Sequence, residues 1–300
     1  NLRAGSGDDI VTLNGTQWTG NTTDVLDLGD GNNTLNISGI AYGRNIDTGS
    51  GNDTLTLNQV GNTASYKVDL NTGAGNDTVT ITGAAHADIE LGSGDDIITL
   101  TGASTGTGSG SLSGSLDTGS GNDIVNIQKG SAQSINTGSG DDTVFVKTTA
   151  STVTLGEGDN KLTTKGNVSG AITAGSGNDI VNILSAASSI NLDEGINKLD
   201  VGTSVAGTVT VGSGDDTINI GTTAKNVNLG DGENILNIGG TSTTINAGSG
   251  KDIIDLGGTT TTVNLGEGDN ELNVEGTTKN LRAGSGDDIV TLNGTQWTGN

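Results

Sequence analysis

The sequence of 300 residues contains no cysteine, no proline and no methionine, and its aromatic residues are limited to two Trp, two Tyr and one Phe. Without cysteine there are neither disulfides nor thiolate metal sites. Because proline cannot donate to a β-ladder, its absence fits strands that are hydrogen-bonded on both sides. Globular cores draw much of their buried area from aromatic rings. We therefore expect a thin core of aliphatic side chains.

Basic residues are also scarce, with 12 Lys and Arg against 35 Asp and Glu and a net charge of −23. We expect no nucleic-acid partner, because neutralising phosphates requires many Lys and Arg side chains. No run reaches the roughly 18 to 20 apolar residues of a membrane span, and no signal-peptide pattern is present. Since the sequence does not begin with Met, we expect it to be a segment of a longer protein.

Glycine is abundant, with 53 copies, and it marks a repeat. The pentapeptide Gly-Ser-Gly-Asp-Asp at 5–9 occurs, with small changes, fifteen times, and we number its residues position 1 to position 5. Position 1 is Gly everywhere except Asp193, and it falls at residues 5, 29, 49, 73, 92, 119, 138, 156, 175, 193, 212, 230, 248, 266 and 284. From residue 119 onward the spacing is 18 or 19 residues. A fixed period of this size is typical of a solenoid.

Each period carries the alternation of β-strands, in which side chains of one face recur every second residue. The residue two places after position 5 is always apolar: Val11, Leu35, Leu55, Val79, Ile98, Val125, Val144, Leu162, Val181, Leu199, Ile218, Leu236, Ile254, Leu272 and Val290. A second apolar column follows two residues later and is broken only by Thr164. Another strand ends each period, with an apolar residue three places before position 1. The pattern predicts an all-β parallel β-solenoid (β-roll or β-helix) with coils of about 18 residues and one Gly-rich turn per coil.

Extra residues occur only in the first half, where we expect them to enlarge the turn opposite the glycine motif. These insertions lie near Asn14–Asp24, Ser38–Asn45, Asn58–Lys67 and Thr101–Ser115. Trp18, Tyr42 and Tyr66 lie in them. One interpretation is tolerated loop growth. The other is an interaction edge, because loops inserted on one side of a solenoid commonly mark its binding face. Such an edge would make lateral self-contacts or stack against the sugar rings of a polysaccharide.

The turn sequence Gly-x-Gly-x-Asp followed by x-apolar-x resembles the nonapeptide of the RTX (haemolysin-type) calcium-binding repeats, and the resemblance covers the whole chain. It implies Ca²⁺ bound between stacked coils by Asp carboxylates and backbone carbonyls. The chain departs from the family pattern in two ways. The leading glycine is replaced by Ala, Thr, Val or Leu, and only one turn per coil carries the motif, so that one column of ions is the most it would hold.

The fifteen turns are of two types. Those with Asp at position 5 have Ser or Ala at position 2, and their Asp residues are our candidate metal ligands: Asp9, Asp53, Asp77, Asp96, Asp123, Asp142, Asp179, Asp216, Asp252 and Asp288. Those with Asn at position 5 have an acidic residue at position 2: Asn33 with Asp30, Asn160 with Glu157, Asn197 with Glu194, Asn234 with Asp231 and Asn270 with Glu267. Each turn keeps one carboxylate in one of two places.

Electrostatics favours a cation most where Asp turns are consecutive. Carboxylates about 4.8 Å apart in neighbouring coils repel by about 3.5 kcal/mol at an effective dielectric of 20, and doubling the distance halves this energy. The run Asp77, Asp96, Asp123 and Asp142 therefore offers the strongest candidate calcium sites, while the alternating stretches would hold fewer ions. The alternative is a column of Asp and Asn that caps turn amides without metal.

Residues 1–21 recur letter for letter as 280–300. We expect residues 1–300 to form a single continuous solenoid, in which 1–279 is one block of fourteen coils and 280–300 starts an identical block. One interpretation is a recent duplication without functional meaning. The other is a fibre of tandem blocks that continue end to end, so that the chain's principal partner is itself.

These features predict a structural, calcium-stabilised filament or surface-protein segment, located outside the cell as a secreted or cell-surface protein. The alternative is a calcium-dependent ice-binding or adhesin stalk region, since the turns at 49–53, 119–123 and 175–179 resemble those of an ice-binding adhesin segment. Catalysis needs unlike residues that converge on one site, and the acidic residues here stand in repeated columns. The one histidine, His86, is interpreted as a turn residue. We predict no enzymatic activity.

Overall fold

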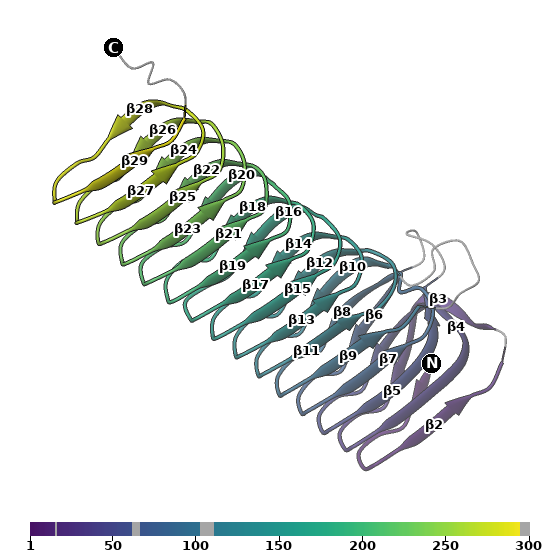
Figure 1. Cartoon of the computed structure of the whole chain (residues 1–300). Helices are drawn as coiled ribbons and strands as arrows, with labels where there is room; N and C mark the ends of the chain where they lie inside the picture. Colours follow the sequence, from purple (N-terminus) through teal and green to yellow (C-terminus); the bar gives the residue numbers. More distant parts are fainter. Residues whose placement is uncertain (16, 62–66, 103–110, 295–300) are drawn as a thin grey trace. The chain divides into compact units, whose positions relative to one another are not determined.

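The computed structural model describes residues 1–15, 17–61, 67–102 and 111–294, and their regular structure consists of β-strands without a helix. The chain divides into two compact units, Asn1–Gly156 (unit 1) and Glu157–Asn300 (unit 2). Figure 1 shows each unit as a stack of coils that repeat one path, strand after strand. The predicted all-β parallel solenoid is confirmed. No helix in the described residues is long and apolar enough to cross a membrane.

In unit 1 one strand of each coil follows the Gly-rich turn and another precedes the next turn. The strands that follow a turn are β2 (Ile10–Leu13), β5 (Thr54–Val60), β7 (Thr78–Ile81), β9 (Ile97–Leu100), β11 (Ile124–Ile127) and β13 (Thr143–Val146). Those that precede a turn are β1 (Leu2–Arg3), β3 (Gln17–Asp27), β6 (Val68–Asn71), β8 (Ala87–Glu90), β10 (Leu112–Asp117), β12 (Ala132–Asn136) and β14 (Ala150–Thr154). One strand, β4 (Thr34–Asp47), runs from one turn to the next.

Unit 2 repeats the same two strands without insertions. The strands that follow a turn are β15 (Lys161–Thr164), β17 (Ile180–Ile183), β19 (Lys198–Val201), β21 (Thr217–Ile220), β23 (Ile235–Ile238), β25 (Ile253–Leu256), β27 (Glu271–Val274) and β29 (Ile289–Leu292). Those that precede a turn are β16 (Val168–Thr173), β18 (Ala187–Asn191), β20 (Val205–Thr210), β22 (Ala224–Asn228), β24 (Ser242–Asn246), β26 (Thr260–Asn264) and β28 (Thr278–Arg282).

Equivalent strands of successive coils pair in parallel and in register. Leu236 of β23 is paired with Ile254 of β25, which occupies the same place one coil later. The residue step between hydrogen-bonded coils is 18 or 19 in unit 2 and reaches 27 in unit 1, where the insertions lie. The strands that follow a turn in unit 2 keep this register, so each of their positions forms a column of like residues. Among the strands that precede a turn, the register shifts within pairs such as β16–β18 and β18–β20.

The core is the strip of aliphatic side chains enclosed by each coil. Both apolar columns predicted after position 5 point inward, and the side chains of Leu55, Leu57, Leu236 and Ile238 are at most 1% exposed. Thr164, the one polar residue in these columns, is also buried, and its hydroxyl donates to the carbonyl of Gly166 at 3.2 Å. The buried hydroxyl of Thr164 therefore has a hydrogen-bond partner two residues away, as burial of a polar group requires.

The insertions of unit 1 correct the expectation of enlarged turns. The first two are largely β-strand: in their backbone register, Gln17–Thr19 of β3 pairs with Ile40–Tyr42 of β4, and Ile40–Ala41 pairs with Gln59–Val60 of β5. The β-branched and aromatic residues of these segments favour strands, and neighbouring insertions supply each other's hydrogen bonds. Tyr66 and the side chains of Trp18 and Tyr42 lie outside what the structure describes, as does much of the fourth insertion.

Adjacent residues of β25 offer a direct test of this packing. Ile254 is 1% exposed, whereas Ile253 points outward and is 36% exposed. We predict that Ile254→Ala lowers the free energy of unfolding by about 2 to 5 kcal/mol through lost burial and a cavity. Ile253→Ala is expected to cost less than about 1 kcal/mol. Urea unfolding followed by circular dichroism measures both, and equal losses would contradict the assigned faces.

Candidate functional site

The Gly-rich turns stack closely because glycine occupies position 3 in all fifteen. Gly250, for example, has a φ of +112°, and a Cβ on it would lie 2.1 Å from the carbonyl oxygen of Gly232 in the preceding coil. Any other residue would therefore meet both a strained backbone and a steric clash. Position 1 also has positive φ in most coils, and Asp193 adopts it at +56° despite its side chain. The turn backbones thus lie against one another along each unit.

Position 5 side chains point into the stack, not toward solvent. Eight of the ten predicted metal ligands are at most 1% exposed: Asp53, Asp77, Asp96, Asp123, Asp142, Asp179, Asp216 and Asp252. Asp9 and Asp288 are half-buried, and each belongs to the first or last described coil. The column predicted from sequence therefore exists within each unit, and it is enclosed by the turn backbone.

One oxygen of each position 5 side chain caps the preceding coil. The Oδ1 atom of Asp77 accepts the backbone N–H of Asp53 at 2.7 Å, and the Oδ1 of Asp96 accepts that of Asp77 at the same distance. Asn residues make the same bond: the Oδ1 of Asn234 accepts the N–H of Asp216 at 3.0 Å. This is the amide-capping column that sequence reasoning held open as the alternative to metal binding. It uses only half of each carboxylate.

Position 4 side chains form a second, exposed ladder in the opposite direction. The Oδ1 of Asn52 accepts the backbone N–H of Asn76 in the following coil at 2.8 Å, and the Oδ1 of Asp215 accepts that of Glu233 at 2.8 Å. Most turns therefore receive one side-chain cap from the coil before them and one from the coil after them. The exceptions among the described turns are those that follow Ile196, Glu233 and Lys251, where position 4 gives no such cap. Where both ladders are present, they fix the stacking of the turns at two backbone amides.

The second carboxylate oxygen has no such partner. In eight Asp residues the Oδ2 atom is buried and receives no hydrogen bond from the described residues: Asp9, Asp53, Asp77, Asp96, Asp123, Asp179, Asp216 and Asp252. A buried, unpaired carboxylate oxygen is costly, so the group either takes up a proton or binds a cation. This repeated orphan atom is the chemical feature that distinguishes the column.

Asn turns satisfy the same place with their own amide. The Nδ2 of Asn33 donates to the carbonyls of Gly29 at 3.1 Å, Gly31 at 3.0 Å and Thr48 at 3.1 Å. The amides of the other Asn residues likewise donate to the position 3 carbonyl of their own turn. Backbone carbonyls thus converge where position 5 carries its second heteroatom. An Asp at position 5 would place a second carboxylate oxygen, which is also an acceptor, where the Asn amide donates to these carbonyls.

Acidic residues at position 2 lie outside the turn. The Oδ1 of Asp231 accepts the hydroxyl of Ser249 in the following coil at 2.5 Å, and Glu157 accepts the backbone N–H of Ser176 at 3.1 Å. These contacts are exposed. The exchange seen in the sequence therefore moves a carboxylate from a buried place to a solvated one.

Buried hydroxyls beside the Asp column were missed by sequence reasoning. Thr48, Thr72, Thr118 and Thr137 stand immediately before position 1, at what we call the leading position, and all are fully buried. Thr48 lies beside Asp53 in its own turn, while its hydroxyl donates to the carbonyl of Thr72 at 3.2 Å. The sequence showed this position only as a departure from the RTX pattern. Its contact with position 5 depends on the fold.

Burial raises the pKa of the Asp column. Loss of solvent is the largest cause and brings the pKa of Asp77, Asp142, Asp179, Asp216 and Asp252 to about 6. The pKa of Asp96 rises further, to about 7, through burial and the charges of Asp77 and Asp123. The consecutive Asp run is therefore where neighbouring carboxylates most disfavour one another's charge.

The column offers oxygen ligands of one class. Among the described residues, no group of three or more His, Cys, Asp or Glu side chains is placed to hold a metal ion. A cation at an Asp turn would therefore be held by a single carboxylate with several backbone carbonyls. Such a set suits Ca²⁺, which takes 6–8 oxygen ligands including carbonyls, and does not suit zinc.

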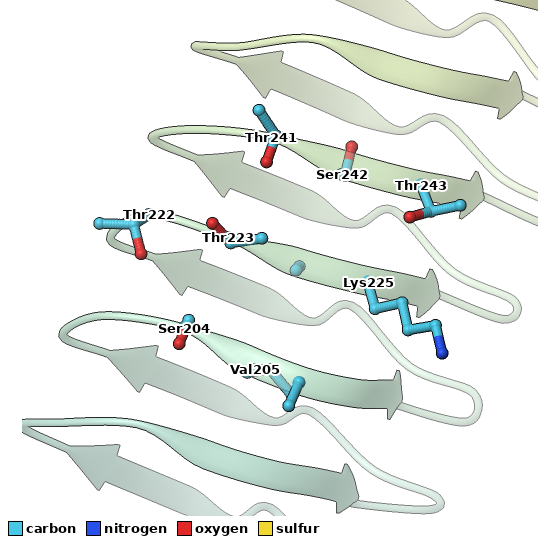
Figure 2. A pocket seen from close by; sticks show the side chains of 10 residues that line it. Ser204, Val205, Thr222, Thr223, Lys225, Thr241, Ser242 and Thr243 are labelled. Atoms are coloured by element: carbon cyan, nitrogen blue, oxygen red, sulfur yellow. The ribbon is translucent and has the colours of Figure 1, made fainter.

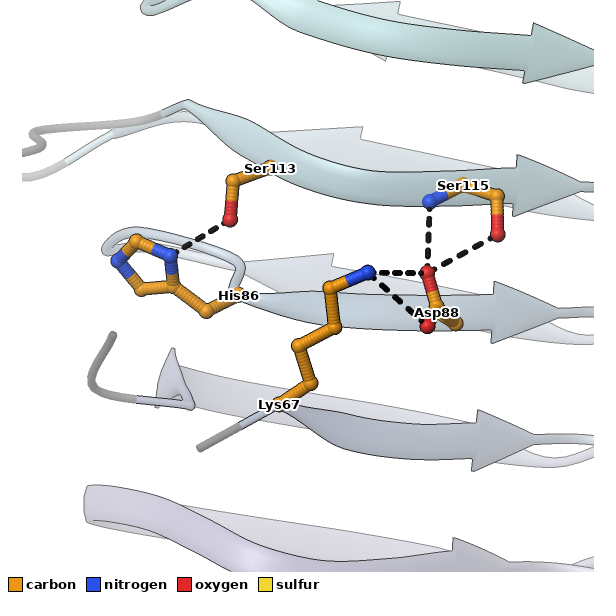
Figure 3. Close-up of polar contacts among 5 residues, drawn as sticks. All are labelled: Lys67, His86, Asp88, Ser113 and Ser115. Atoms are coloured by element: carbon orange, nitrogen blue, oxygen red, sulfur yellow. Dashed lines mark hydrogen bonds and ion pairs between the residues drawn. The ribbon is translucent and has the colours of Figure 1, made fainter. Parts of the chain in front are cut away.

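Two other features carry polar groups away from the Gly-rich turns. A hollow of about 500 Å³ lies over the starts of β20, β22 and β24, and Lys225 is the ionisable side chain among its described lining residues (Figure 2). In unit 1 the Nδ1 of His86, just before β8, lies 2.6 Å from the Oγ of Ser113 (Figure 3).

The carboxylate next to this histidine is held by other groups. Asp88 accepts the Nζ of Lys67 at 3.1 Å and the backbone N–H of Ser115 at 2.9 Å (Figure 3). Burial acts to raise the pKa of Asp88, but these bonds outweigh it and hold the pKa below its usual value. The Asp88 carboxylate is thus a stable anion that joins three successive coils.

The raised pKa values predict an inverted pH dependence for the metal-free protein. Between about pH 4 and 7 the folded carboxyls, with pKa values of about 6 to 7, hold protons that unfolded Asp, with a pKa of 3.8, has released. The free energy of unfolding in EGTA should therefore fall as the pH rises through this window. Urea unfolding at about pH 5 and about pH 7.5 measures the change. Greater stability at the higher pH would contradict it.

Comparison with known proteins gives no match to this chain, whether among family models, curated proteins or solved structures. The geometry of the repeated turns is therefore the basis for the functional conclusion.

Proposed function

We propose that this chain is a structural segment of an extracellular filament or surface protein, a β-solenoid of the RTX kind that is stabilised by Ca²⁺ bound along its Asp turns. The observation that supports this most strongly is the column of buried Oδ2 atoms without hydrogen-bond partners. A catalytic role is not part of the proposal.

Calcium suits the atoms around the Asp turns. The turn at 49–53 illustrates the set of oxygen donors. Its Asp53 carboxylate corresponds to the Asn33 amide one coil earlier, and that amide meets three backbone carbonyls. These are hard oxygen donors, which Ca²⁺ prefers in flexible, irregular arrangements. A bound cation supplies the positive charge that the buried oxygen lacks. The Asp residues and turn carbonyls would be its protein ligands.

The charge of the chain suggests where it works. At −23 the protein repels itself unless cations compensate its 35 acidic residues. Calcium sites of extracellular modules bind with Kd values of about 10⁻⁴ to 10⁻³ M, and a site with one carboxylate per turn suits that range. The chain would then be poorly stabilised where calcium is scarce and would become rigid where calcium is plentiful.

The repeated 21-residue segment supports continuation from block to block. Leu281 of β28 pairs with Val263 of the coil before it, and its counterpart Leu2 in β1 pairs with Leu26 of the coil after it. The same sequence therefore makes a coil that accepts a neighbour on either side. Tandem copies would stack through this coil without a globular break, as solenoid repeats do.

Removal of calcium tests the proposal directly. We predict that the protein in a few mM CaCl₂ retains its β-sheet circular dichroism to a higher temperature than the same protein in EGTA at pH 7.5, because ligand binding to the folded state raises its apparent stability. Magnesium at equal concentration is the control, since its smaller ion demands near-octahedral geometry. Superimposable melting curves in CaCl₂ and EGTA would refute calcium stabilisation.

A further inference from the structure

The two turn types differ at a third place, the leading position before position 1. In all five Asn turns this residue is leucine: Leu28, Leu155, Leu192, Leu229 and Leu265. In nine of the ten Asp turns it is smaller or carries a hydroxyl: Ala4, Thr48, Thr72, Thr118, Thr137, Ala174, Val211, Ala247 and Ala283. Leu91, beside Asp96, is the exception. The identity of a buried core residue thus follows the choice between amide and carboxylate.

The structure gives this correlation a physical cause. The leading residue is buried in all but the first and last turns, and in the threonine-bearing turns it lies beside the position 5 carboxyl of the same turn. Its size therefore sets how much space remains next to the second heteroatom of position 5. From their sizes, a leucine at this position would fill that space with methyl groups and an alanine would leave it open, whereas the threonines place a hydroxyl oxygen there.

In an Asn turn the place next to position 5 is complete. The Asn33 amide donates to three carbonyls, from positions 1 and 3 of its own turn and from the leading residue of the next coil. Leu28, the leading residue of this turn, is fully buried. Both heteroatoms of the Asn33 side chain are hydrogen-bonded, so the turn needs nothing from solution.

In an Asp turn the same place lacks its donor. The Asp53 Oδ1 accepts the backbone N–H of Asn33 at 2.7 Å, which is the cap that an Asn also makes. By analogy with the Asn33 turn, Oδ2 then takes the place of the amide nitrogen, among the turn carbonyls. The Oδ2 is buried without a hydrogen-bond partner among the described residues, and the Thr48 side chain lies beside the carboxyl. The orphan atom, the converging carbonyls and the smaller leading residue are three independent signs of one missing positive ligand.

We propose that the Asn turns are cation-free coils in which an amide and a leucine replace the divalent cation that each Asp turn takes up. The inference rests on the proposed calcium function and adds which turns bind and which do not. Asp and Asn turns alternate within unit 2, so its cations lie two coils, about 9.6 Å, apart. The Asp turns from 49 to 142 are consecutive, so their cations lie one coil, about 4.8 Å, apart.

The spacing of the cations suggests why Asn turns alternate with Asp turns. Cations in successive coils repel one another, and doubling their separation halves that repulsion. An Asn coil between two Asp coils keeps the stack closed at a place where no ion is needed. The acid at position 2 of the Asn turn is exposed and bonded to the next coil's serine, so it maintains surface charge without taking part in the buried site.

Calcium stoichiometry in the full chain tests the inference. The double variant Leu229→Ala/Asn234→Asp converts one Asn turn to the Asp type, and we expect it to bind one more Ca²⁺ per chain than the wild type. Asp252→Asn makes the reverse change at position 5 and should bind one fewer. Equilibrium dialysis followed by metal analysis gives the counts, and circular dichroism in CaCl₂ verifies that each variant is folded.

A matched control separates the buried carboxylates from the exposed ones. Asp231→Ser removes a position 2 acid and should leave the count unchanged, whereas loss of one ion would make position 2 the ligand and overturn the inference. Stability in EGTA is the second readout: Asp252→Asn should melt at a higher temperature than the wild type, because its amide supplies the missing donor.

The possible failures are distinguishable. If the wild type binds no calcium, the proposed function is wrong. If the wild type binds calcium but Asp252→Asn binds the same number and gains no stability in EGTA, the inference alone is wrong. Should the double variant fail to fold, the comparison of Asp252→Asn with Asp231→Ser still decides between the two positions.

Discussion

The turns of this solenoid depend on one electrostatic requirement: a carboxylate oxygen taken out of water needs a positively polarised partner. The fold supplies half of what each buried Asp needs, because Oδ1 accepts a backbone N–H from the preceding coil. The part of the chain that the structure describes provides no such donor for the Oδ2 atoms of residues such as Asp77 and Asp96. A proton would supply it in mild acid, and in our proposal a cation supplies it near neutral pH. In Asn turns it comes from the side-chain amide itself. A proton, a metal ion and a side-chain amide are thus three alternative ways to provide the same missing positively polarised partner.

Glycine makes this requirement unavoidable. Because position 3 has no Cβ, successive turn backbones approach until the Cα of one lies against the carbonyl of the next. Water is thereby excluded from the interior of the turns, and position 5 is buried although it belongs to a turn. A looser stack would solvate the carboxylates, leave their pKa values near normal and remove any need for a cation. The need for a positively charged ligand is therefore a direct consequence of the close stacking of the turn backbones.

The coil period, the inward columns and the parallel register were predictable from sequence, because strand alternation is local and the spacing is regular. The pairing of Gln17–Thr19 with Ile40–Tyr42 was not, since it depends on two insertions meeting in space. The alignment of residues such as Asp77 and Asp96 in one column was also predictable, whereas their role as metal ligands stays a prediction. The sequence could not predict that Oδ1 of each of these carboxylates accepts a backbone N–H while Oδ2 is buried without a hydrogen-bond partner in the described part of the chain. The pairing of Leu229 with Asn234 can be read from the sequence. It gains a physical meaning only because the structure places the leading position beside position 5, as Thr48 lies beside Asp53.

The two opposed ladders of the turns have a consequence for how force and unfolding travel. Position 5 accepts an amide of the preceding coil, and position 4, where it is Asp or Asn, accepts one of the following coil, so such an interior coil holds the amides of both neighbours. Opening one coil in the middle of a unit would strand a backbone N–H on each side, whereas a terminal coil gives up one cap only. Unfolding should therefore begin at a terminal coil and proceed one coil at a time, instead of starting with an interior coil.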